Sequence, residues 1–456
     1  MRRKIYNVLL DWKNKSGGTS ALMLDGARRV GKSYIAEEFA RNEYENYLLI
    51  DFAVATKEVK RYFEDYLSDL DTFFMYLQAA YNVELPRRKS VIIFDEVQRF
   101  PRAREAIKYL VADGRYDYIE TGSLISIGRS VKNIVIPSEE HHVKMFPMDF
   151  EEFLWATGNE AKWPLVCQAY ERRQAVEAGL HRWTMDVFRQ YMIVGGMPQV
   201  VKKFVATHDL RAVDAEKRDI LELYRADIMK FGGVSRHKIL AIFNAIPGEL
   251  QHHAKVFSPG AVRKGAGMRT FESAFQWLAS AMTVNLAYNA TEPNLGLELS
   301  SDHHALKCYL ADTGLFVSMA FSENELLSGE VQQRILTGRL EGNFGMIWET
   351  AVAQMLRAAG HQLFFYMSND ATNAANRMEI DFLVAKATLQ RRHNVAPIEV
   401  KGTGEYATKS LDKFMRKYDA FLDEGVVIHE KNLERGDRRL SIPVYMTPLL
   451  QVTPRG

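Results

Sequence analysis

Cysteine is scarce in this chain of 456 residues, which contains only Cys167 and Cys308. The two thiols stand far apart in the sequence and fit no metal-ligand spacing. Their isolation excludes a disulfide-rich secreted scaffold and a cysteine-ligated zinc site, and it suits the reducing cytosol. We expect both cysteines to fill the core, as free cysteines usually do.

Long apolar runs and a strong charge bias are also missing. No stretch approaches the roughly 18 uninterrupted apolar residues of a membrane helix, and the apolar part of residues 1–15 is too short for a signal peptide. The formal net charge is only +2, which gives no overall field toward nucleic acid or membrane. We therefore expect a cytoplasmic protein without a membrane partner, and its length predicts two to four domains of about 100–200 residues each.

A glycine-rich loop near the N-terminus is the strongest signal that the sequence contains. Residues 21–24 are apolar, residues 26–33 read GARRVGKS, and residues 33–39 have the apolar spacing of a helix. A strand, a G-x-x-x-x-G-K-[ST] loop and a helix are typical of a P-loop, whose glycines and amides cradle nucleotide phosphates. Lys32 is expected on the β- and γ-phosphates and Ser33 on Mg²⁺. The other candidate ligands in the loop are Gly26, Arg28, Arg29, Val30 and Gly31, with solvated arginines as the alternative for the two cations.

A second apolar strand, SVIIF at residues 90–94, ends in Asp95 and Glu96. Apolar residues followed by two carboxylates are typical of a Walker B strand, in which Asp95 would bind Mg²⁺ and Glu96 would be the general base for water. A third strand follows, with Thr121 and Ser123 after it. Because ligands in open parallel sheets lie at the carboxyl ends of the strands, Thr121 and Ser123 are candidate contacts for the γ-phosphate, with a plain turn as the alternative.

Four stretches, GARRVGKS, VIIFDEVQRFP, ETGSLISIG and FPMDFEEFLWA, resemble a widespread family of prokaryotic ATPases in the AAA+/STAND-like P-loop group, the archaeal-type ATPases. The resemblance implies an ATPase domain over residues 1–160 that uses ATP with Mg²⁺, and a C-terminal domain of unknown function. Ser33 departs from the threonine that is commoner in this family, but either hydroxyl binds Mg²⁺. Many AAA+ relatives form rings, so an oligomer is compatible with the resemblance.

The middle of the chain divides into two parts. Residues 161–234 are charged and helical in pattern, and YMIVGGMP at residues 191–198 marks a break between helices. Residues 235–300 contain three helical patterns followed by a strand, which suggests the winged helix that the family resemblance also implies. One interpretation is DNA contact through the helix near Arg269. The other is a protein-packing module, because Glu272 balances the charge of Arg269.

The C-terminal third contains a helix with Glu349, a strand with Asp381, and a strand with Glu399 and Lys401. Side chains alternate between the faces of a strand, so Glu399 and Lys401 share a face that Asp381 can meet from a neighbouring strand. The set resembles the PD-(D/E)xK core of restriction-endonuclease-like nucleases, without its leading proline. The resemblance implies catalysis by Glu349, Asp381, Glu399 and Lys401, with Mg²⁺ held by Asp381 and Glu399. A surface ion pair and a binding module that does not cleave are the alternatives.

The predicted fold is therefore α/β: an N-terminal P-loop AAA+-like ATPase domain, a helical and winged-helix middle, and a PD-(D/E)xK nuclease-like α/β domain at residues 301–456. The predicted function is ATP hydrolysis coupled to a DNA-binding or nuclease-like C-terminal module. One alternative is a nucleotide-dependent switch or scaffold that recruits a protein partner and has an inactive nuclease-like domain. Another is a nuclease with a structural P-loop domain. ATP, DNA and a protein are thus the candidate partners.

Overall fold

Contacts divide the chain into two compact units. The N-terminal unit comprises Arg2–Phe146, and the C-terminal unit comprises Pro147–Gly456 with Met1. This division precedes the predicted domain boundary at residue 160. The computed structural model describes residues 1–122, 138–252, 256–263, 265, 267–294, 296–322, 325–339, 345–370, 373, 376–386, 393–402 and 406–450.

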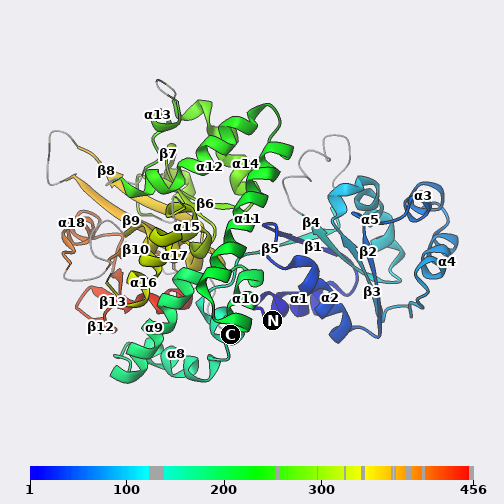
Figure 1. The fold of residues 1–456 in the computed structure, drawn as a ribbon, viewed down its shortest axis with the longest axis horizontal. Coiled ribbons are helices and arrows are strands. Elements are labelled where there is room, and N and C mark those ends of the chain that lie inside the picture. The colour runs from blue at the N-terminus through cyan, green and yellow to red at the C-terminus, as the bar shows by residue number, and fades with distance from the viewer. Residues whose placement is uncertain are drawn as a thin grey trace. The chain divides into compact units, whose positions relative to one another are not determined.

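The N-terminal unit is built around a sheet of five strands (Figure 1). Its elements are α1 (Ile5–Ser16), β1 (Ala21–Gly26), α2 (Lys32–Glu43), β2 (Asn46–Asp51), α3 (Lys57–Asp65), α4 (Leu70–Tyr81), β3 (Ser90–Asp95), α5 (Pro101–Asp113), β4 (Asp117–Gly122) and β5 (Glu140–Met145). The strand order is β2-β3-β4-β1-β5, and every neighbouring pair is parallel. The carboxyl end of β4 therefore lies between the phosphate loop, which follows β1, and Asp95, which ends β3.

Helices cover both faces of this sheet. Successive side chains of a strand point to opposite faces, so Leu22 and Met23 enter different cores. Leu22 packs with Phe39 of α2, and α1 contributes to the same core. Met23 packs with Phe63 of α3 and Ile107 of α5 in the other core. Burial of both faces explains why β1, β3 and β4 are buried along their whole length, and why β1 and β3 contain apolar runs.

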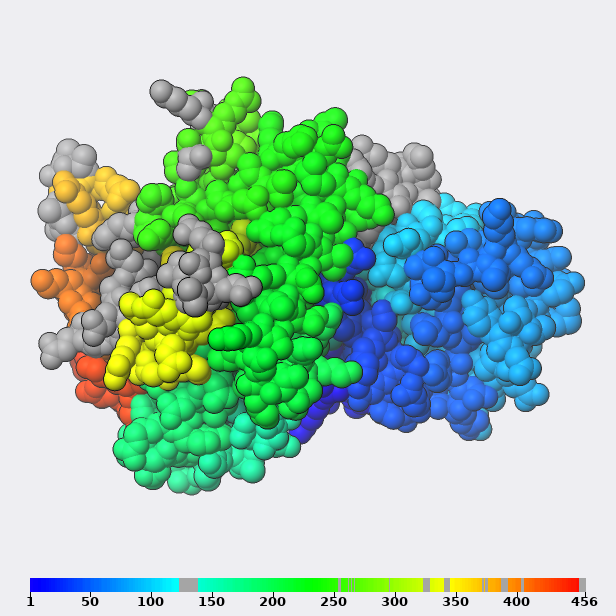
Figure 2. Space-filling view, in the orientation of Figure 1, coloured from blue at the N-terminus to red at the C-terminus, as the bar shows by residue number. Residues whose placement is uncertain are grey.

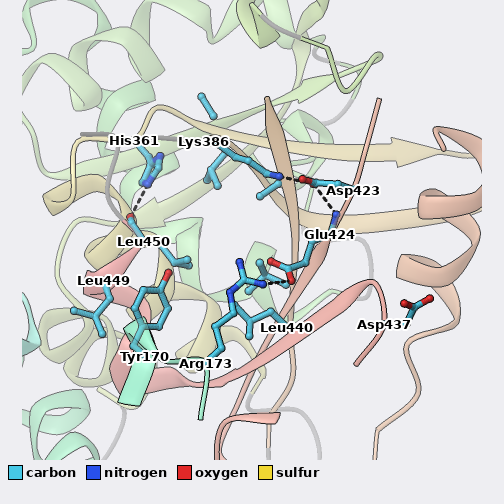
Figure 3. A pocket seen from close by; sticks show the side chains of 14 residues that line it. Tyr170, Arg173, His361, Lys386, Asp423, Glu424, Asp437, Leu440, Leu449 and Leu450 are labelled. Atoms are coloured by element: carbon cyan, nitrogen blue, oxygen red, sulfur yellow. Dashed lines mark hydrogen bonds and ion pairs between the residues drawn. The ribbon is translucent and has the colours of Figure 1, made fainter. Parts of the chain in front are cut away.

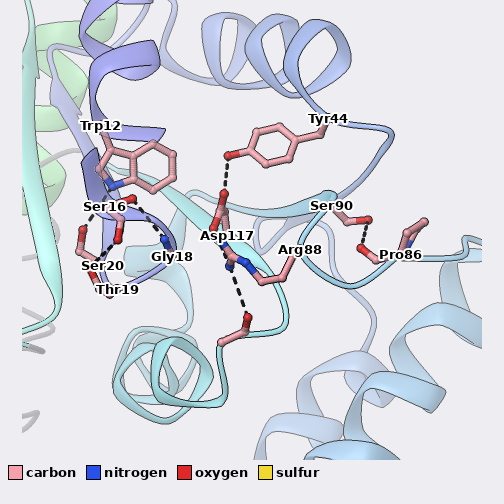
Figure 4. A network of polar contacts seen from close by, with 11 residues as sticks. Trp12, Ser16, Gly18, Thr19, Ser20, Tyr44, Pro86, Arg88, Ser90 and Asp117 are labelled. Carbon is pink, nitrogen blue, oxygen red and sulfur yellow. Dashed lines mark hydrogen bonds and ion pairs between the residues drawn. The ribbon is translucent and has the colours of Figure 1, made fainter. Parts of the chain in front are cut away.

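Polar contacts join the amino ends of these strands (Figure 4). The Tyr44 hydroxyl donates to Oδ2 of Asp117 at 2.8 Å, and Nη1 of Arg88 donates to Oδ1 of Asp117 at 3.0 Å. The same Nη1 donates to the Gly114 carbonyl at 3.3 Å. Burial and then the charge of Asp117 raise the pKa of Tyr44. The network lies opposite the carboxyl edge of the sheet, so it stabilises the fold without lining the phosphate loop.

The C-terminal unit contains a larger sheet of eight strands in the order β12-β13-β11-β10-β9-β8-β6-β7. In Figure 2 the green part of the chain, to which α11 (Leu210–Phe231) and α12 (Arg236–Gln251) belong, lies at the surface of this unit. None of the helices among the described residues is long and apolar enough to cross a membrane. The elements of the unit are α7 (Phe150–Ala156), α8 (Trp163–Glu171), α9 (Ala178–Val194), α10 (Pro198–Thr207), α11 (Leu210–Phe231), α12 (Arg236–Gln251), α13 (Pro259–Val262), α14 (Glu272–Ser280), β6 (Val284–Ala290), β7 (Ser301–Leu310), α15 (Thr313–Ala320), α16 (Glu325–Leu336), α17 (Gly345–Ala358), β8 (Leu363–Ser368), β9 (Met378–Ala385), β10 (Val395–Val400), α18 (Lys409–Lys417), β11 (Gly425–His429), β12 (Glu434–Arg435) and β13 (Arg439–Pro443).

The strand of the predicted winged helix belongs to this sheet. β6 pairs in parallel with β8 and antiparallel with β7, so it is an internal strand. The predicted boundary between residues 300 and 301 therefore divides one sheet, and the structure differs here from the predicted separate domain at residues 235–300. Periodicity located the helices and the strand β6, but it carries no information on which strand pairs with which.

The predicted helix break at YMIVGGMP is present between α9 and α10, and it is tightly packed. The N–H of Gly196 donates to Oδ2 of Asp312 at 2.6 Å. A Cβ on Gly196 would lie 2.1 Å from the carbonyl oxygen of Met148. Lys217 of α11 is buried and donates to the Ile193 carbonyl at 2.8 Å. The glycine is therefore required by the close approach of two backbone segments.

Candidate functional site

The phosphate loop joins β1 to α2 at the carboxyl edge of the parallel sheet. Gly31 directly precedes α2 and has a φ of 97°, a conformation that favours glycine. A Cβ on Gly26 would lie 2.7 Å from the carbonyl oxygen of Met145 and 2.9 Å from the Val30 side chain. Each glycine of the motif is thus required by the backbone, one for its dihedral angle and the other for space.

Lys32 is buried at the start of α2 and folds back over the loop. Its Nζ donates to the carbonyl oxygens of Gly26 at 2.9 Å and Ala27 at 3.0 Å. Burial lowers the pKa of Lys32 to about 8, against the attraction of Glu96 and Asp95. A buried ammonium whose hydrogen-bond acceptors are neutral carbonyls gains strongly from an added anion, which suits it to bind phosphate.

Three side-chain oxygens from three different elements meet beside the loop. Oγ of Ser33 donates to Oδ1 of Asp95 at 2.7 Å, and Oγ1 of Thr121 donates to the same oxygen. The N–H of Glu96 reaches Oγ1 of Thr121 at 3.5 Å. Hydroxyl and carboxylate oxygens are the ligands that Mg²⁺ prefers. The structure therefore brings Ser33 and Asp95 together with Thr121, the candidate on the strand between them.

Glu96 follows Asp95 in a left-handed backbone conformation, with a φ of 54°. Nε2 of Gln98 donates to Oε2 of Glu96 at 2.6 Å, and Nε of Arg99 lies 3.9 Å from the same oxygen. Strand alternation does not predict these two contacts, because they are made in the short turn after β3. They hold the predicted base at the rim of the site.

The remaining loop residues have different environments. Arg28 and Arg29 are exposed and Val30 is buried, whereas Ser123 lies outside the described residues. Nη1 of Arg3 donates to the Val30 carbonyl at 3.2 Å, and its Nη2 donates to the Phe146 carbonyl at 2.7 Å. Arg3 thereby anchors the loop backbone. No motif marks it in the sequence, because its partners are backbone carbonyls rather than side chains.

A cluster of charged side chains lies next to Asp25, the residue of β1 that directly precedes the phosphate loop. Nδ1 of His142 is 2.8 Å from Oδ2 of Asp25, and its Nε2 is 3.1 Å from Oε2 of Glu140. Arg104 donates two hydrogen bonds to Glu140, at 2.8 and 2.5 Å. The contacts with Asp25 and then Glu140 raise the pKa of His142 to about 9, and burial raises the pKa of Glu120 well above its usual value. Since Asp25 directly precedes the loop, the cluster anchors the strand end from which the loop begins.

In the C-terminal unit, two of the predicted nuclease residues face a buried lysine and tyrosine. Nζ of Lys307 lies 2.7 Å from Oε1 of Glu379 and 3.8 Å from Oδ1 of Asp381. The Tyr309 hydroxyl donates to Oε2 of Glu349 at 3.1 Å. Lys307 and Tyr309 both come from β7, a strand that the sequence did not predict. Burial and then the charge of Glu349 raise the pKa of Tyr309 well above its usual value.

The other two predicted residues lie in a different environment. Nζ of Lys401 donates to Oε1 of Glu399 at 2.6 Å, and the charge of Asp412 and the backbone at the start of α18 also act on Glu399. Burial raises the pKa of Glu399, against the attraction of Lys401. Oδ2 of Asp381 instead accepts the N–H of Val400 at 2.8 Å. Within the described residues, no three His, Cys, Asp or Glu side chains are grouped so that they could hold a metal ion.

A β-bulge between β8 and β9 explains this separation. The pairing register of the two strands shifts between Phe364 and Tyr366. Ile380 and Leu383 consequently belong to the same core under α18, although simple alternation would place them on opposite faces. Phe382 packs against Tyr309 on the other side, with ring centroids 5.7 Å apart. The bulge therefore places Oδ1 of Asp381 near Lys307 of β7, while Oδ2 contacts the backbone N–H of Val400 rather than the side chains of Glu399 and Lys401.

A cavity of about 560 Å³ also lies in the C-terminal unit (Figure 3). Its lining includes two cations, and each already has a carboxylate partner. Nη1 of Arg173 lies 2.6 Å from Oε1 of Glu424, and Lys386 forms an ion pair with Asp423. Asp437 adds a third carboxylate to the lining, so the charged side chains of the cavity are two cations and three carboxylates.

Comparison with known proteins gives three family matches. Residues 18–154 match the model described as AAA domain. Residues 185–326 and 344–446 match two domains of unknown function, DUF8612 and DUF4143. The AAA match, the parallel sheet and its phosphate loop together support a P-loop ATPase domain in the N-terminal unit. The other two descriptions name no function, and neither names a nuclease or a winged helix.

No curated protein matches the chain. Among solved structures, the chain is similar to a Walker-type ATPase of Pyrococcus abyssi, with 15% sequence identity and a TM-score of 0.40. The similarity covers 70% of this chain and 95% of the other. Within this chain, the DUF8612 match crosses both predicted boundaries of the middle region, at residues 234 and 300.

Proposed function

We propose that the N-terminal unit binds ATP with Mg²⁺ and hydrolyses it. The observation that carries this proposal is the meeting of Ser33 Oγ, Asp95 Oδ1 and Thr121 Oγ1 beside the buried Lys32. A hydroxyl and a carboxylate there suit a hard divalent cation, and an ammonium beside them suits the phosphates that accompany it. The AAA match over residues 18–154 supports the same activity.

Each residue has a distinct role in this proposal. The Lys32 ammonium would leave the loop carbonyls, bind the terminal phosphates and offset the charge that develops on them. Ser33 and Asp95 would hold Mg²⁺, which stabilises negative charge on the phosphates. Glu96 would orient and deprotonate the attacking water, after its carboxylate leaves Gln98 and Arg99. The loop N–H groups between Gly26 and Gly31 would donate to phosphate oxygens.

The test is Mg²⁺-dependent phosphate release from ATP by the full chain. The substitution Glu96→Gln keeps the size of the side chain and removes the base. We expect it to lower kcat by about 100-fold while ATP binding, followed by fluorescence of a labelled ATP analogue, is retained. Glu105→Gln on α5, which changes a partly exposed carboxylate that pairs with Arg102 in the same unit, is the control. Equal rates for Glu96→Gln and the wild type would contradict the assigned role.

We further propose that the C-terminal unit is a binding module that does not cleave DNA, as in the alternative with an inactive nuclease-like domain. This is supported by the placement of Asp381 beside Lys307 and of Glu399 beside Lys401 and α18. A nuclease site of this class needs its carboxylates around one metal ion. Instead, each carboxylate is engaged by a different lysine, and a cation close by competes with the metal for the same oxygens.

Plasmid nicking in the presence of Mg²⁺ or Mn²⁺ tests this second proposal. We expect no cleavage by the wild type and no difference between the wild type and Asp381→Ala. Metal-dependent nicking that is lost in Asp381→Ala but kept in Glu96→Gln would overturn it. That result would restore the prediction of an active nuclease domain, and it would leave the ATPase proposal untouched.

A further inference from the structure

A groove of about 640 Å³ lies in the N-terminal unit between β2 and the helices α3 and α4. In the sheet order, β3 and β4 separate β2 from β1, so the groove is distinct from the phosphate loop. We call it the β2 groove. The residues of its lining that matter for the argument are Asp51, Val54, Glu58, Tyr62, Tyr76 and Tyr81.

The lining combines carboxylates with stacked phenol rings. The rings of Tyr62 and Tyr76 are stacked, with centroids 5.3 Å apart and an interplanar angle of 22°. Oε1 of Glu58 accepts the Tyr62 hydroxyl at 2.9 Å. Among the described residues that line the groove, Asp51 and Glu58 are the charged ones, and both are acidic. Aromatic faces beside carboxylates bind a guanidinium by cation–π contact and ion pairing.

Part of this surface is apolar and open to solvent. The side chain of Val54 is 78% exposed and that of Tyr76 is 37% exposed. Two alanines of α4 and Ala55 add further small apolar surface to the lining. A single exposed valine is ordinary, but exposed apolar side chains gathered around a groove with charge of one sign are typical of an interaction site.

The groove also borders an open strand edge. β2 is the terminal strand in the described sheet and pairs with β3 on one side. The backbone groups on the other side of such a strand can pair with an extended segment of another chain. The N–H of Phe52, which directly follows β2, donates to the Asp95 carbonyl at 3.0 Å. The groove is therefore joined through one backbone hydrogen bond to the residue assigned to Mg²⁺.

We propose that the β2 groove binds an extended, arginine-bearing segment of a partner protein. The segment adds to the open edge of β2, and its arginine packs on the exposed ring of Tyr76, which Tyr62 supports from below, and pairs with Glu58 and Asp51. The argument for this occupant is charge complementarity together with the strand edge. An acidic segment would meet repulsion from both carboxylates, and a compact partner without an extended strand would leave the edge of β2 uncovered.

The experiment measures binding of short peptides to the full chain by fluorescence anisotropy, without nucleotide. The probe is a fluorescein-labelled octapeptide of alternating threonine and valine with one central arginine. We expect a matched peptide with glutamate in place of arginine to bind about tenfold more weakly. A third peptide, with a proline beside the arginine, should also bind more weakly, because proline cannot complete the backbone pairing.

Variants of the chain locate the site. Glu58→Gln and Tyr76→Ala should each weaken binding of the arginine peptide by about fivefold. Two variants outside the groove are the controls. Glu64→Gln changes an exposed carboxylate on α3, the helix that also contains Glu58, and Tyr109→Ala changes an exposed tyrosine on α5. These two matched controls should bind the arginine peptide as the wild type does.

Three results would overturn the proposal. The arginine and glutamate peptides could bind equally, or the control variants could weaken binding as much as Glu58→Gln and Tyr76→Ala. Size-exclusion chromatography could show that Tyr76→Ala dissociates an oligomer in the absence of peptide, which would mean that a second copy of the chain covers the groove. ATP hydrolysis is measured on the same samples, so failure of the peptide site is distinguishable from failure of the ATPase.

Discussion

Two candidate sites were predicted from strand patterns: the phosphate loop region, and the nuclease-like region with Asp381 and Glu399 in the C-terminal sheet. Their side chains are arranged differently in the structure. In the first region, Ser33, Asp95 and Thr121 meet at one oxygen atom. In the second, Asp381 and Glu399 have different lysine partners. Residues that directly follow parallel strands meet at the carboxyl edge of the sheet, whatever the face to which they point. A site on the face of a sheet instead requires each of its side chains to point to that face. One β-bulge is enough to change the face on which the following side chains lie.

The largest difference between the two regions is expected when a lysine of each is replaced and the rate of ATP hydrolysis is measured. We expect Lys32→Ala to lower kcat/KM for ATP by about 100-fold or more, because a buried cation next to developing phosphate charge is lost. Lys401→Ala should leave the rate unchanged. The measurement is Mg²⁺-dependent phosphate release over a range of ATP concentrations. A comparable loss in both variants would mean that the two regions share one function.

The second largest effect is expected on the free energy of unfolding, where two lysines of the C-terminal unit should differ from each other. Lys307 is fully buried next to Glu379 and Asp381, so Lys307→Met would leave two carboxylates without their cation. We expect a loss of about 3–5 kcal/mol in the free energy of unfolding.

Lys401→Met is the matched control for that experiment, because Lys401 is partly exposed and forms an ion pair with Glu399. Its expected cost is about 1 kcal/mol or less. Urea unfolding followed by tryptophan fluorescence measures both variants. Equal losses would show that Lys307 is not the structural lysine that its burial indicates.

The sequence predicted the first region well because its signals are local. The strand before GARRVGKS, the helix after it and the carboxylates after SVIIF can all be identified without knowing any strand pairing. Thr121 gave a weaker signal, because a hydroxyl after a strand is common in turns. The contacts of Gln98 and Arg99 with Glu96 gave none, since they depend on the left-handed turn at Glu96.

The second region could be predicted only in part. The helix α17 and the strands β9 and β10 were located by their periodicity. Glu349, Asp381 and Glu399 lie on them, and Lys401 directly follows β10. The strand β7 was not predicted, and with it the partners Lys307 and Tyr309 were missed. The bulge between β8 and β9 arises from tertiary pairing and has no local sequence signal here. Element positions were therefore predictable, whereas the side of the sheet on which Asp381 lies was not.

A smaller effect should reveal the anchoring of the phosphate loop by Arg3. Arg3→Ala removes the hydrogen bonds to the carbonyls of Val30 and Phe146, so the loop should lose part of its preorganisation. We expect about a fivefold increase in the Kd of a fluorescent ATP analogue. Arg2→Ala, at the exposed neighbouring position, is the control. An unchanged Kd in Arg3→Ala would show that the remaining loop contacts suffice.

The smallest effect is a pH dependence of stability that originates in the cluster of charged side chains next to Asp25. Hydrogen bonds to Asp25 and then Glu140 raise the pKa of His142 to about 9, above the value of about 6.5 expected in the unfolded chain. Protonated His142 therefore stabilises the fold fully below about pH 6.5, and this contribution is lost as the pH rises through about 9.

Because the His142 side chain is 42% exposed, solvent screening reduces the effect, and we expect a decrease of about 1–2 °C in Tm across this range. His142→Gln should remove that part of the pH dependence, whereas His141→Gln, which changes the preceding residue of β5 on its other face, should retain it. Thermal unfolding of the three proteins at pH 6, 7.5 and 9 gives the comparison. If the wild-type and His142→Gln curves run parallel, the charge of His142 does not stabilise the strand end below the loop, and the anchoring of Asp25 must come from its place in the sheet alone.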